Sequence, residues 1–322
     1  MRPAALGAVA LLVACAARGP ALTVRPPKVD VERVRAERAS HYDHAMRAVR
    51  AYYERLARVS APLLLESASI CEPKVTPSLG VVAFSPRRFV EWSQHLETQA
   101  DLREAAARVL GARAGLTLIT VTPGSSAEAA GARPGDVLRS VNGRAVTDPK
   151  DVWRALAAER ERAPLLSLRR GDEEWDAEAP LRMACDVPID LAFRPDLLAF
   201  WTPRGVTIST GMLDLLDSDD QLAFVLSHEI AHMIIDRGHG KPKQIERNAD
   251  YLGCYLSARA GFEIAELPSF WRRWAALVPF GITSLQATHP GTPERALLLE
   301  ATVEEIEGKR KAGLPLLPQL AE

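Results

Sequence analysis

Two histidines and a glutamate stand at a spacing that could hold a metal ion and use it. His228 and His232 are four residues apart, so on a helix both imidazoles leave the same face. Glu229 directly follows the first histidine. Two histidines one turn apart can hold Zn²⁺, and the glutamate is placed to deprotonate a water molecule. We therefore expect His228 and His232 to be zinc ligands and Glu229 to be the general base.

A third ligand is expected from the acidic pair that follows. Glu246 and Asp250 are again four residues apart. On a second, antiparallel helix, Glu246 would complete a set of two histidines and one glutamate, which leaves the fourth position of a zinc ion for water. Asp250 could accept the free N–H of a ligand histidine and fix its tautomer. The alternative interpretation is an exposed helix whose two histidines form ordinary hydrogen bonds. It gives no role to Glu246 and Asp250, so we expect one zinc ion per chain.

The element that positions the histidines is predicted over residues 221–235. Ser218 and the two aspartates after it can cap its start, because side-chain oxygens there accept the first free backbone N–H groups. Apolar residues leave the opposite face and can pack on a core. A short strand is predicted at 206–210, just before this helix.

Residues 115–181 differ from the rest of the chain in their pattern, with β-branched residues in short runs separated by turn-forming residues. Strands are predicted at 116–121, 138–141 and 165–168, with a helix at 148–161. The stretch from Gly124 reads Gly-Ser-Ser-Ala-x-Ala-Ala-Gly-x-x-Pro-Gly-Asp-Val-Leu, with Val-Asn-Gly after it, and it closely resembles a PDZ domain.

The PDZ resemblance implies a site for free protein C-termini. Gly115, Leu116, Thr117 and Leu118 align with the loop whose N–H groups capture a terminal carboxylate, and the strand after it would pair with the peptide. The alternative is a PDZ domain that serves only as a rigid spacer.

The zinc motif and its surroundings resemble the gluzincin metallopeptidases that include HtpX, BepA and the CAAX prenyl endopeptidase. The likeness extends to the segment 205–213 and to Thr-His-Pro-Gly-Thr-Pro-Glu-Arg at 288–295. It implies an edge strand that pairs with substrate backbone, and it assigns Val206, Ile208 and Thr210 to that strand. His289 and Arg295 become candidates for oxyanion stabilisation. Structural contacts beneath the site are the equally weighted alternative for these two residues.

One position departs from that family's usual pattern. The family has Asn-Ala before the edge strand, where this chain has Leu198 and Ala199. Because the asparagine would help to shape the cleft, the departure bears on substrate preference and on the level of activity.

The N-terminus resembles a bacterial lipoprotein signal. Met1 and Arg2 precede an apolar run from Ala4 to Ala14, which ends in Leu-Val-Ala-Cys at Cys15. We expect residues 1–14 to be a signal peptide, Cys15 to be lipidated and residues 15–28 to be a tether. The expected location is the bacterial envelope, facing the periplasm and, with Ala16 after the cysteine, on the outer membrane. A plain signal peptide is the alternative.

Length and composition limit the classes of protein to which the chain can belong. The chain has 322 residues, a length that favours two domains. Of its residues 47% are hydrophobic and 25% are charged, a composition that excludes a disordered chain. The net charge is -1 and no run of basic residues occurs, so the sequence provides no positive electrostatic field that would attract nucleic acid. After the first fifteen residues no apolar run approaches the ~18 needed to span a bilayer, which excludes a polytopic membrane protein.

The predicted fold class is α+β. A mostly helical zinc peptidase domain with a small edge-strand sheet is interrupted by a β-rich PDZ domain. Residues 29–110 are assigned to the N-terminal helical part, residues 111–182 to the PDZ domain and residues 183–322 to the catalytic domain.

Cys71 and Cys185 flank the inserted segment. In an oxidising compartment they could form a disulfide at its base. Cys254 would then be a buried free thiol. The three possible pairings among these cysteines stay open at this point, with Cys71–Cys185 favoured.

Two functional hypotheses follow. The leading one is a lipid-anchored zinc metalloendopeptidase that acts on misfolded or misassembled envelope proteins, with polypeptide substrates recruited by the PDZ domain. The rival is a PDZ-based binding or chaperone lipoprotein whose peptidase domain is latent or weakly active.

Overall fold

The computed structural model describes residues 24–72, 74–85, 99–113, 115–235, 242–277 and 293–319. The fold mixes helices with small sheets, as the sequence predicts, and the chain forms two compact units, residues 1–38 and 39–322. In the first unit, residues 24–38 are all exposed and include the start of helix α1 (Val31–Glu66). None of the helices in these ranges combines the length and apolarity that a bilayer crossing needs. Cys15 and His289 lie outside the described residues.

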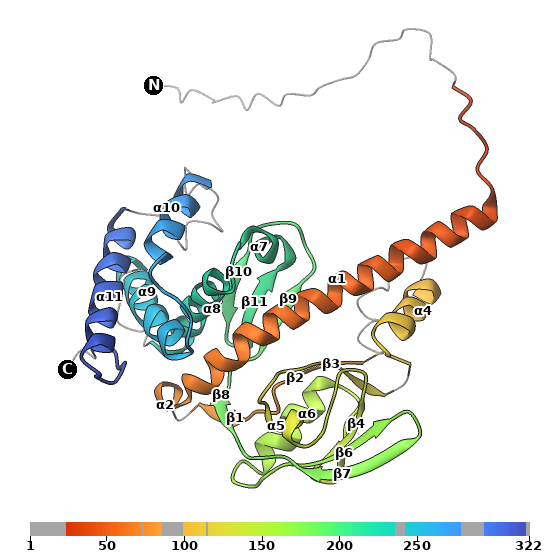
Figure 1. The fold of residues 1–322 in the computed structure, drawn as a ribbon, viewed down its shortest axis with the longest axis horizontal. Helices are drawn as coiled ribbons and strands as arrows, with labels where there is room; N and C mark the ends of the chain where they lie inside the picture. Colours follow the sequence, from red (N-terminus) through yellow and green to blue (C-terminus); the bar gives the residue numbers. More distant parts are fainter. Residues whose placement is uncertain are drawn as a thin grey trace, which may run out of the picture. The chain divides into compact units, whose positions relative to one another are not determined.

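A six-stranded antiparallel sheet forms the β-rich part of the second unit (Figure 1). Its strand order is β2 (Val81–Phe84), β3 (Leu116–Val121), β4 (Val137–Val141), β6 (Leu165–Arg170) and β7 (Glu173–Glu178), and β5 (Arg144–Ala145) also pairs with β4. Two helices accompany the sheet, α5 (Ser126–Ala129) and α6 (Pro149–Ala158). Strand β2 precedes the expected PDZ boundary at residue 111 by about thirty positions, so the sheet begins earlier in the chain than the prediction placed it.

Local sequence explains the turns of this sheet. Asn142 and Gly143 both have positive φ, 53° and 72°, as a tight hairpin turn between β4 and β5 requires. Asp148 caps α6 by accepting from the N–H of Lys150, and Asp151 completes a capping box. These contacts fix the start of α6 next to the sheet.

The two faces of β2 and β3 pack on different cores. Side chains alternate along a strand, so Val81 and Ala83 join the core of the β-rich part while Val82 and Phe84 face the other way. That second face packs with residues of α1 and of α4 (Gln99–Val109) around Ile119. Helix α4 lies within residues 29–110, which the sequence assigns to the N-terminal helical part.

The prediction that residues 115–118 form a loop that binds a peptide C-terminus is wrong. Leu116, Thr117 and Leu118 lie in β3, which pairs with β2 on one side and β4 on the other. Their exposed fractions are 0%, 0% and 1%. Because both edges of β3 are occupied here, no peptide strand can be added beside Gly115–Leu118.

The small sheet before the histidine helix has the order β10 (Ala199–Thr202), β11 (Gly205–Ser209), β9 (Ile189–Ala192). Strand β11 is therefore the central strand, antiparallel to β10 and parallel to β9. The prediction that Val206, Ile208 and Thr210 form an edge strand is wrong. Val206 and Ile208 are completely buried, and Thr210 begins helix α7 (Thr210–Leu215). Strand β9 pairs with one side of β11 and β10 with the other, so β9 and β10 are the two edge strands of this sheet.

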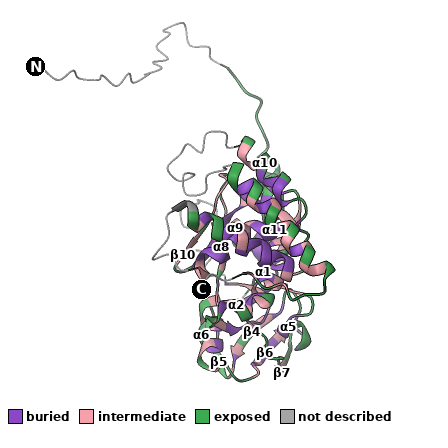
Figure 2. Ribbon diagram, turned by 90° about the vertical axis from the view of Figure 1, so that its left-hand side faces the viewer, coloured by how far each residue is buried: buried purple, intermediate pink, exposed green. Residues whose placement is uncertain are grey.

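Four further helices are described after this sheet and α7: α8 (Asp219–Ile234), α9 (Pro242–Arg259), α10 (Leu267–Leu277) and α11 (Pro293–Lys311). Helices α8 and α9 pack against each other, and many of their residues are buried, coloured purple in the ribbon of Figure 2. Ser218 caps α8 by accepting from the N–H of Gln221, as predicted. This cap and the apolar contacts of α8 hold the histidine pair in the core.

A disulfide joins the segments that enter and leave the β-rich part. Cys71 at the end of α2 (Ala68–Cys71) bonds to Cys185 in β8 (Met183–Cys185), with a Cα–Cα distance of 5.5 Å. Strand β1 (Val75–Pro77) pairs with β8 beside it. Cys254 is the free cysteine of the described residues and is buried.

Candidate metal centre

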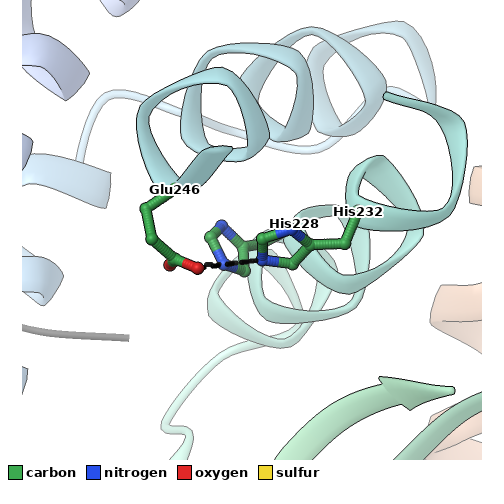
Figure 3. Close-up of side chains that lie close together, drawn as sticks. All are labelled: His228, His232 and Glu246. Carbon is green, nitrogen blue, oxygen red and sulfur yellow. Dashed lines mark hydrogen bonds and ion pairs between the residues drawn. The ribbon is translucent and has the colours of Figure 1, made fainter. Parts of the chain in front are cut away.

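The predicted ligands converge from two helices (Figure 3). His228 and His232 project from α8, and their Nε2 atoms are 3.1 Å apart. Glu246 projects from α9, with Oε2 3.5 Å from His228 Nε2 and Oε1 3.4 Å from His232 Nε2. One donor atom from each residue lies within 4.8 Å of the others. The three side chains are 6%, 3% and 7% exposed, so this cluster is buried.

A close approach of α9 to α8 makes this convergence possible. A Cβ atom on Gly253 would lie 3.1 Å from the backbone nitrogen of His228, so a larger residue would push the helices apart. Near the same crossing, Ser257 Oγ lies within 3.1 Å of Ser227 Oγ. The spacing of four residues on each helix then brings the histidine pair and the acidic pair face to face.

Asp250 lies behind the first histidine. Its Oδ1 is 3.0 Å from His228 Nδ1, and Asp250 is completely buried. This position fits the expected role, since a carboxylate at Nδ1 turns Nε2 toward the centre.

Arg295, from α11, lies beneath the acidic pair. Its Nε and one terminal nitrogen donate to the two oxygens of Asp250 at 2.6 and 2.7 Å. Another terminal nitrogen is 3.2 Å from Glu246 Oε2, and Arg295 is 3% exposed. Of the two roles considered for Arg295, the geometry matches the structural contact: the guanidinium binds the carboxylates that support the centre.

Charge and burial compete at this cluster. Burial alone would lower the pKa of His228, but the carboxylates of Asp250 and Glu246 outweigh it and raise that pKa from 6.5 to about 9. Burial would raise the pKa of Asp250, whereas Arg295 and His228 lower it below its usual value. The site is thus built to concentrate negative charge around two imidazoles, which favours a cation between them.

The donor set matches a zinc ion on its chemistry. Two imidazole nitrogens and one carboxylate oxygen are the protein ligands of many catalytic zinc sites. They converge here in a buried position with a carboxylate on the outer nitrogen of His228. The residues present therefore fit the metal that the sequence predicts.

Glu229 lies next to this centre and lines a cavity of about 60 Å³ together with His228. It is 3% exposed. Aromatic residues of α10 line the same cavity, and sequence reasoning missed them. Their spacing, with Phe270, Trp271 and Trp274 within two turns, was the available signal.

The comparisons with known proteins concern two segments of the chain. Residues 186–240 match the family model described as peptidase family M48, and residues 119–170 match that of a PDZ domain. The chain thus carries an M48 peptidase segment together with a PDZ domain. No curated protein matches the chain.

Two solved structures show a partial likeness. The HtrA3 PDZ domain bound to a phage-derived ligand (FGRWV) is 20% identical over 34% of this chain and 88% of that chain, with a TM-score of 0.24. The HtrA-type protease AlgW with a decapeptide is 23% identical over 34% of this chain and 30% of that chain, with a TM-score of 0.23.

Proposed function

We propose that this protein is a zinc metalloendopeptidase that hydrolyses peptide bonds in polypeptide substrates. The observation that carries the proposal is the buried convergence of His228, His232 and Glu246, with Glu229 beside them in a cavity. Both histidines lie inside the segment that matches the M48 peptidase family. Two histidines and a glutamate leave one zinc position open for chemistry.

The residues around the site have separate tasks in this proposal. A bound Zn²⁺ would supply Lewis acidity toward a water molecule and toward the scissile carbonyl. Glu229 takes the proton of the attacking water and returns it to the leaving amine. Asp250 holds the imidazole of His228 with Nε2 toward the centre, and Arg295 holds Asp250 and Glu246 in place.

Substrate backbone would pair with the edge strand β10. Ala199, the first residue of β10, lines the same cavity as His228 and Glu229, whereas β11 is paired on both sides. An extended segment added to a free sheet edge gains main-chain hydrogen bonds that do not depend on side-chain identity. This arrangement favours a polypeptide over a small ester or phosphate as the substrate.

The PDZ domain would recruit free C-termini at strand β2. Among the described residues β2 pairs only with β3, so its outer edge is available for an added strand. Gly80, directly before β2, has φ of 68°. Titration with a fluorescent pentapeptide tests this: binding should weaken at least tenfold when its C-terminal carboxylate is amidated, and equal binding would contradict the proposal.

The location we propose is the bacterial envelope, with a lipid anchor on Cys15 and the catalytic part facing the periplasm. The sequence of the first fifteen residues supports it, together with a disulfide of the kind that persists in oxidising compartments. Misfolded or misassembled envelope proteins would then be the natural substrates.

Metal analysis combined with casein digestion tests the catalytic proposal. The purified protein should contain one zinc per chain and should digest casein in a reaction that a chelator stops and added zinc restores. Glu229→Gln is the matched control, because it keeps all three ligands but removes the general base, and it should retain zinc while losing about 10²–10⁴-fold in rate. Chelator-resistant digestion, or wild-type rates in Glu229→Gln, would refute the mechanism. Zinc binding without digestion would favour the binding or chaperone hypothesis.

A further inference from the structure

A second cavity lies between α1 and the start of the β-rich part. Its volume is about 300 Å³, and none of the predicted zinc ligands lines it. Ser78 and Gly80, just before β2, line one part of it, together with the loop at 122–126. The apolar residues that α1 adds to its lining are Ala61, Pro62 and Leu65. The proposed hydrolysis gives this cavity no role.

The charged residues that line this cavity are both positive. They are Arg58 of α1 and Arg182, which directly precedes β8. Two carboxylates contact the lining from outside: Asp219 accepts from Arg58 Nε at 2.7 Å, and Glu128 accepts from the N–H of Gly124 at 2.6 Å. The bond to Asp219 uses only Nε, and the terminal nitrogens of Arg58 have no hydrogen bond to the described residues. The cavity therefore offers guanidinium donors to an anion.

The direction of β2 decides which end of an added peptide reaches the cavity. Each described pairing within the six-stranded sheet is antiparallel. A peptide that continues this pattern beside β2 runs opposite to it, so its last residue lies next to Gly80. A parallel peptide would bring its positive amino group to two arginines instead. Charge therefore favours the antiparallel arrangement, with the terminal carboxylate in the cavity.

We propose that Arg58 and Arg182 bind the terminal carboxylate of a peptide held at β2, so that α1 completes this recognition site. The inference rests on the proposed recruitment of C-termini. It adds two residues that lie outside the segment 119–170, which matches the PDZ family model. Arg58 also contacts Asp219, the first residue of α8. One guanidinium thus joins the bound C-terminus to the helix that carries both histidines of the metal centre.

Asp219 and the bound carboxylate compete for the charge of Arg58. Asparagine at position 219 would keep an oxygen that accepts from Arg58 Nε but would carry no charge. Because the side chain of Arg58 is 59% exposed, solvent screens this competition. Asp219→Asn should therefore tighten the binding of a free C-terminus about two- to fivefold. By reciprocity, the bound C-terminus weakens the contact between Arg58 and Asp219 by the same factor.

Fluorescence titration with a labelled pentapeptide that ends in valine, with a free or an amidated C-terminus, tests this site at pH 7. Arg58→Gln and Arg182→Gln should each weaken binding of the free acid about three- to fivefold, and the double variant should weaken it at least about tenfold. The amidated peptide should bind all these variants alike, because it carries no charge for the arginines to contact. Arg47→Gln, on an exposed part of α1 outside the cavity, is the matched control and should bind like the wild type.

The two peptides separate this inference from the proposal on which it rests. Equal binding of both by the wild type would contradict the recruitment of C-termini itself. A preference for the free acid that persists in the double arginine variant would leave recruitment intact and overturn the inference. An equal loss of affinity for both peptides would overturn it too, because the arginines would then support the fold rather than bind the carboxylate. Unchanged binding in Asp219→Asn would overturn the link to α8.

Discussion

At the scale of single residues, the centre depends on three donor atoms that replace water around an ion. His228, His232 and Glu246 each supply one atom of the cluster, and all three are buried. Because two ligands hold zinc far less tightly than three, the loss of any one should be visible in metal content at equilibrium.

We expect His228→Ala to lose stoichiometric zinc. The substitution removes one nitrogen donor and also leaves Asp250 without the imidazole that lies 3.0 Å away. Metal content measured after dialysis should fall from one ion per chain to well below one. His44→Ala, on the exposed part of α1, is the control and should keep the full content. Stoichiometric zinc in His228→Ala would remove this residue from the ligand set.

Asp250→Asn should weaken zinc binding without changing the ligands. The carboxylate at His228 Nδ1 orients the ring and makes Nε2 a stronger donor, and losing such a partner typically costs about 10–100-fold in metal affinity. Competition against a zinc-binding dye measures it. Asp214→Asn, whose carboxylate accepts from Tyr52 away from the centre, should bind zinc like the wild type. Unchanged affinity in Asp250→Asn would mean that Asp250 serves the fold alone.

At the scale of elements, the start of the histidine helix is fixed by α1. Arg55 and Arg58 of α1 both bond to Asp219, the first residue of α8, at 3.1 and 2.7 Å. Arg55 also donates to the backbone carbonyls of Leu213 and Leu216 at the end of α7. These bonds hold three helices together about two and a half turns before the metal ligands begin.

We expect Asp219→Asn to lower the free energy of unfolding by about 1–2 kcal/mol at pH 7, because hydrogen bonds to charged groups contribute about 1.5–3 kcal/mol and solvent screens a side chain that is 34% exposed. Burial would raise the pKa of Asp219, but Arg58 and Arg55 outweigh it and lower that pKa below 3.8. A lowered native pKa stabilises the fold above about pH 4, and that contribution disappears as the pH falls through the native value. Urea unfolding should therefore show a difference from wild type that shrinks between pH 5 and pH 2.

Asp217→Asn provides the control for this measurement. Its side chain is 79% exposed and lies 3.9 Å from Arg273, so its loss should change the free energy of unfolding by a few tenths of a kcal/mol at most. A difference in Asp219→Asn that stays constant from pH 7 to pH 2 would show that the charge of Asp219 is not the source of the effect.

At the scale of the whole molecule, the disulfide closes a long loop that contains the β-rich part. Cys71 and Cys185 are 114 positions apart in sequence. Closing a loop of this length stabilises a fold by about 4–5 kcal/mol in the chain-entropy account. The paired double substitution Cys71→Ser with Cys185→Ser should lower the free energy of unfolding by an amount of this order, measured by urea denaturation.

Reductant supplies the internal control for the disulfide. It should lower the free energy of unfolding of the wild type toward that of the double variant and leave the variant unchanged. A wild type that is insensitive to reductant, with full reduction shown by thiol titration, would contradict a stabilising role for this bond.

Removal of the PDZ region is not a clean way to separate its function from catalysis. Deleting residues 111–181 would leave β2 without β3 and would expose the apolar face that α1 shares with Val82 and Phe84. A change in the ligand, such as amidation of the peptide C-terminus, is a better probe, because the β2 residues belong to the two cores and a Cβ atom on Gly80 would clash with Ser125.

Attachment to a membrane is the prediction that concerns the chain as a whole. Mass spectrometry of the mature protein should find an acylated Cys15 as its first residue, and Cys15→Ser should be released from membranes. Two or three acyl chains anchor a protein stably, whereas a single chain holds it only marginally. A mature form that begins at another residue, without a lipid, would contradict the anchor.

Sequence alone determined the parts of this protein that depend on short-range geometry. His228 and His232 share a helix face because four residues make about one turn, and the same rule pairs Glu246 with Asp250. Ser218 caps α8 by accepting from Gln221 three residues later, and Asn142 with Gly143 form the tight turn between β4 and β5. Such features need no knowledge of distant segments.

Tertiary structure decided which strands lie at an edge and which residues surround the centre. Strand β3 reads locally as a site for an added peptide, yet β2 and β4, whose paired residues lie tens of positions away along the chain, occupy both of its sides. The place of Arg295 under the acidic pair and the wall that α10 adds to the cavity likewise depend on how helices pack. These contacts join residues separated by tens of positions, and the free energy of each is set by burial and pairing in the folded chain rather than by local preference.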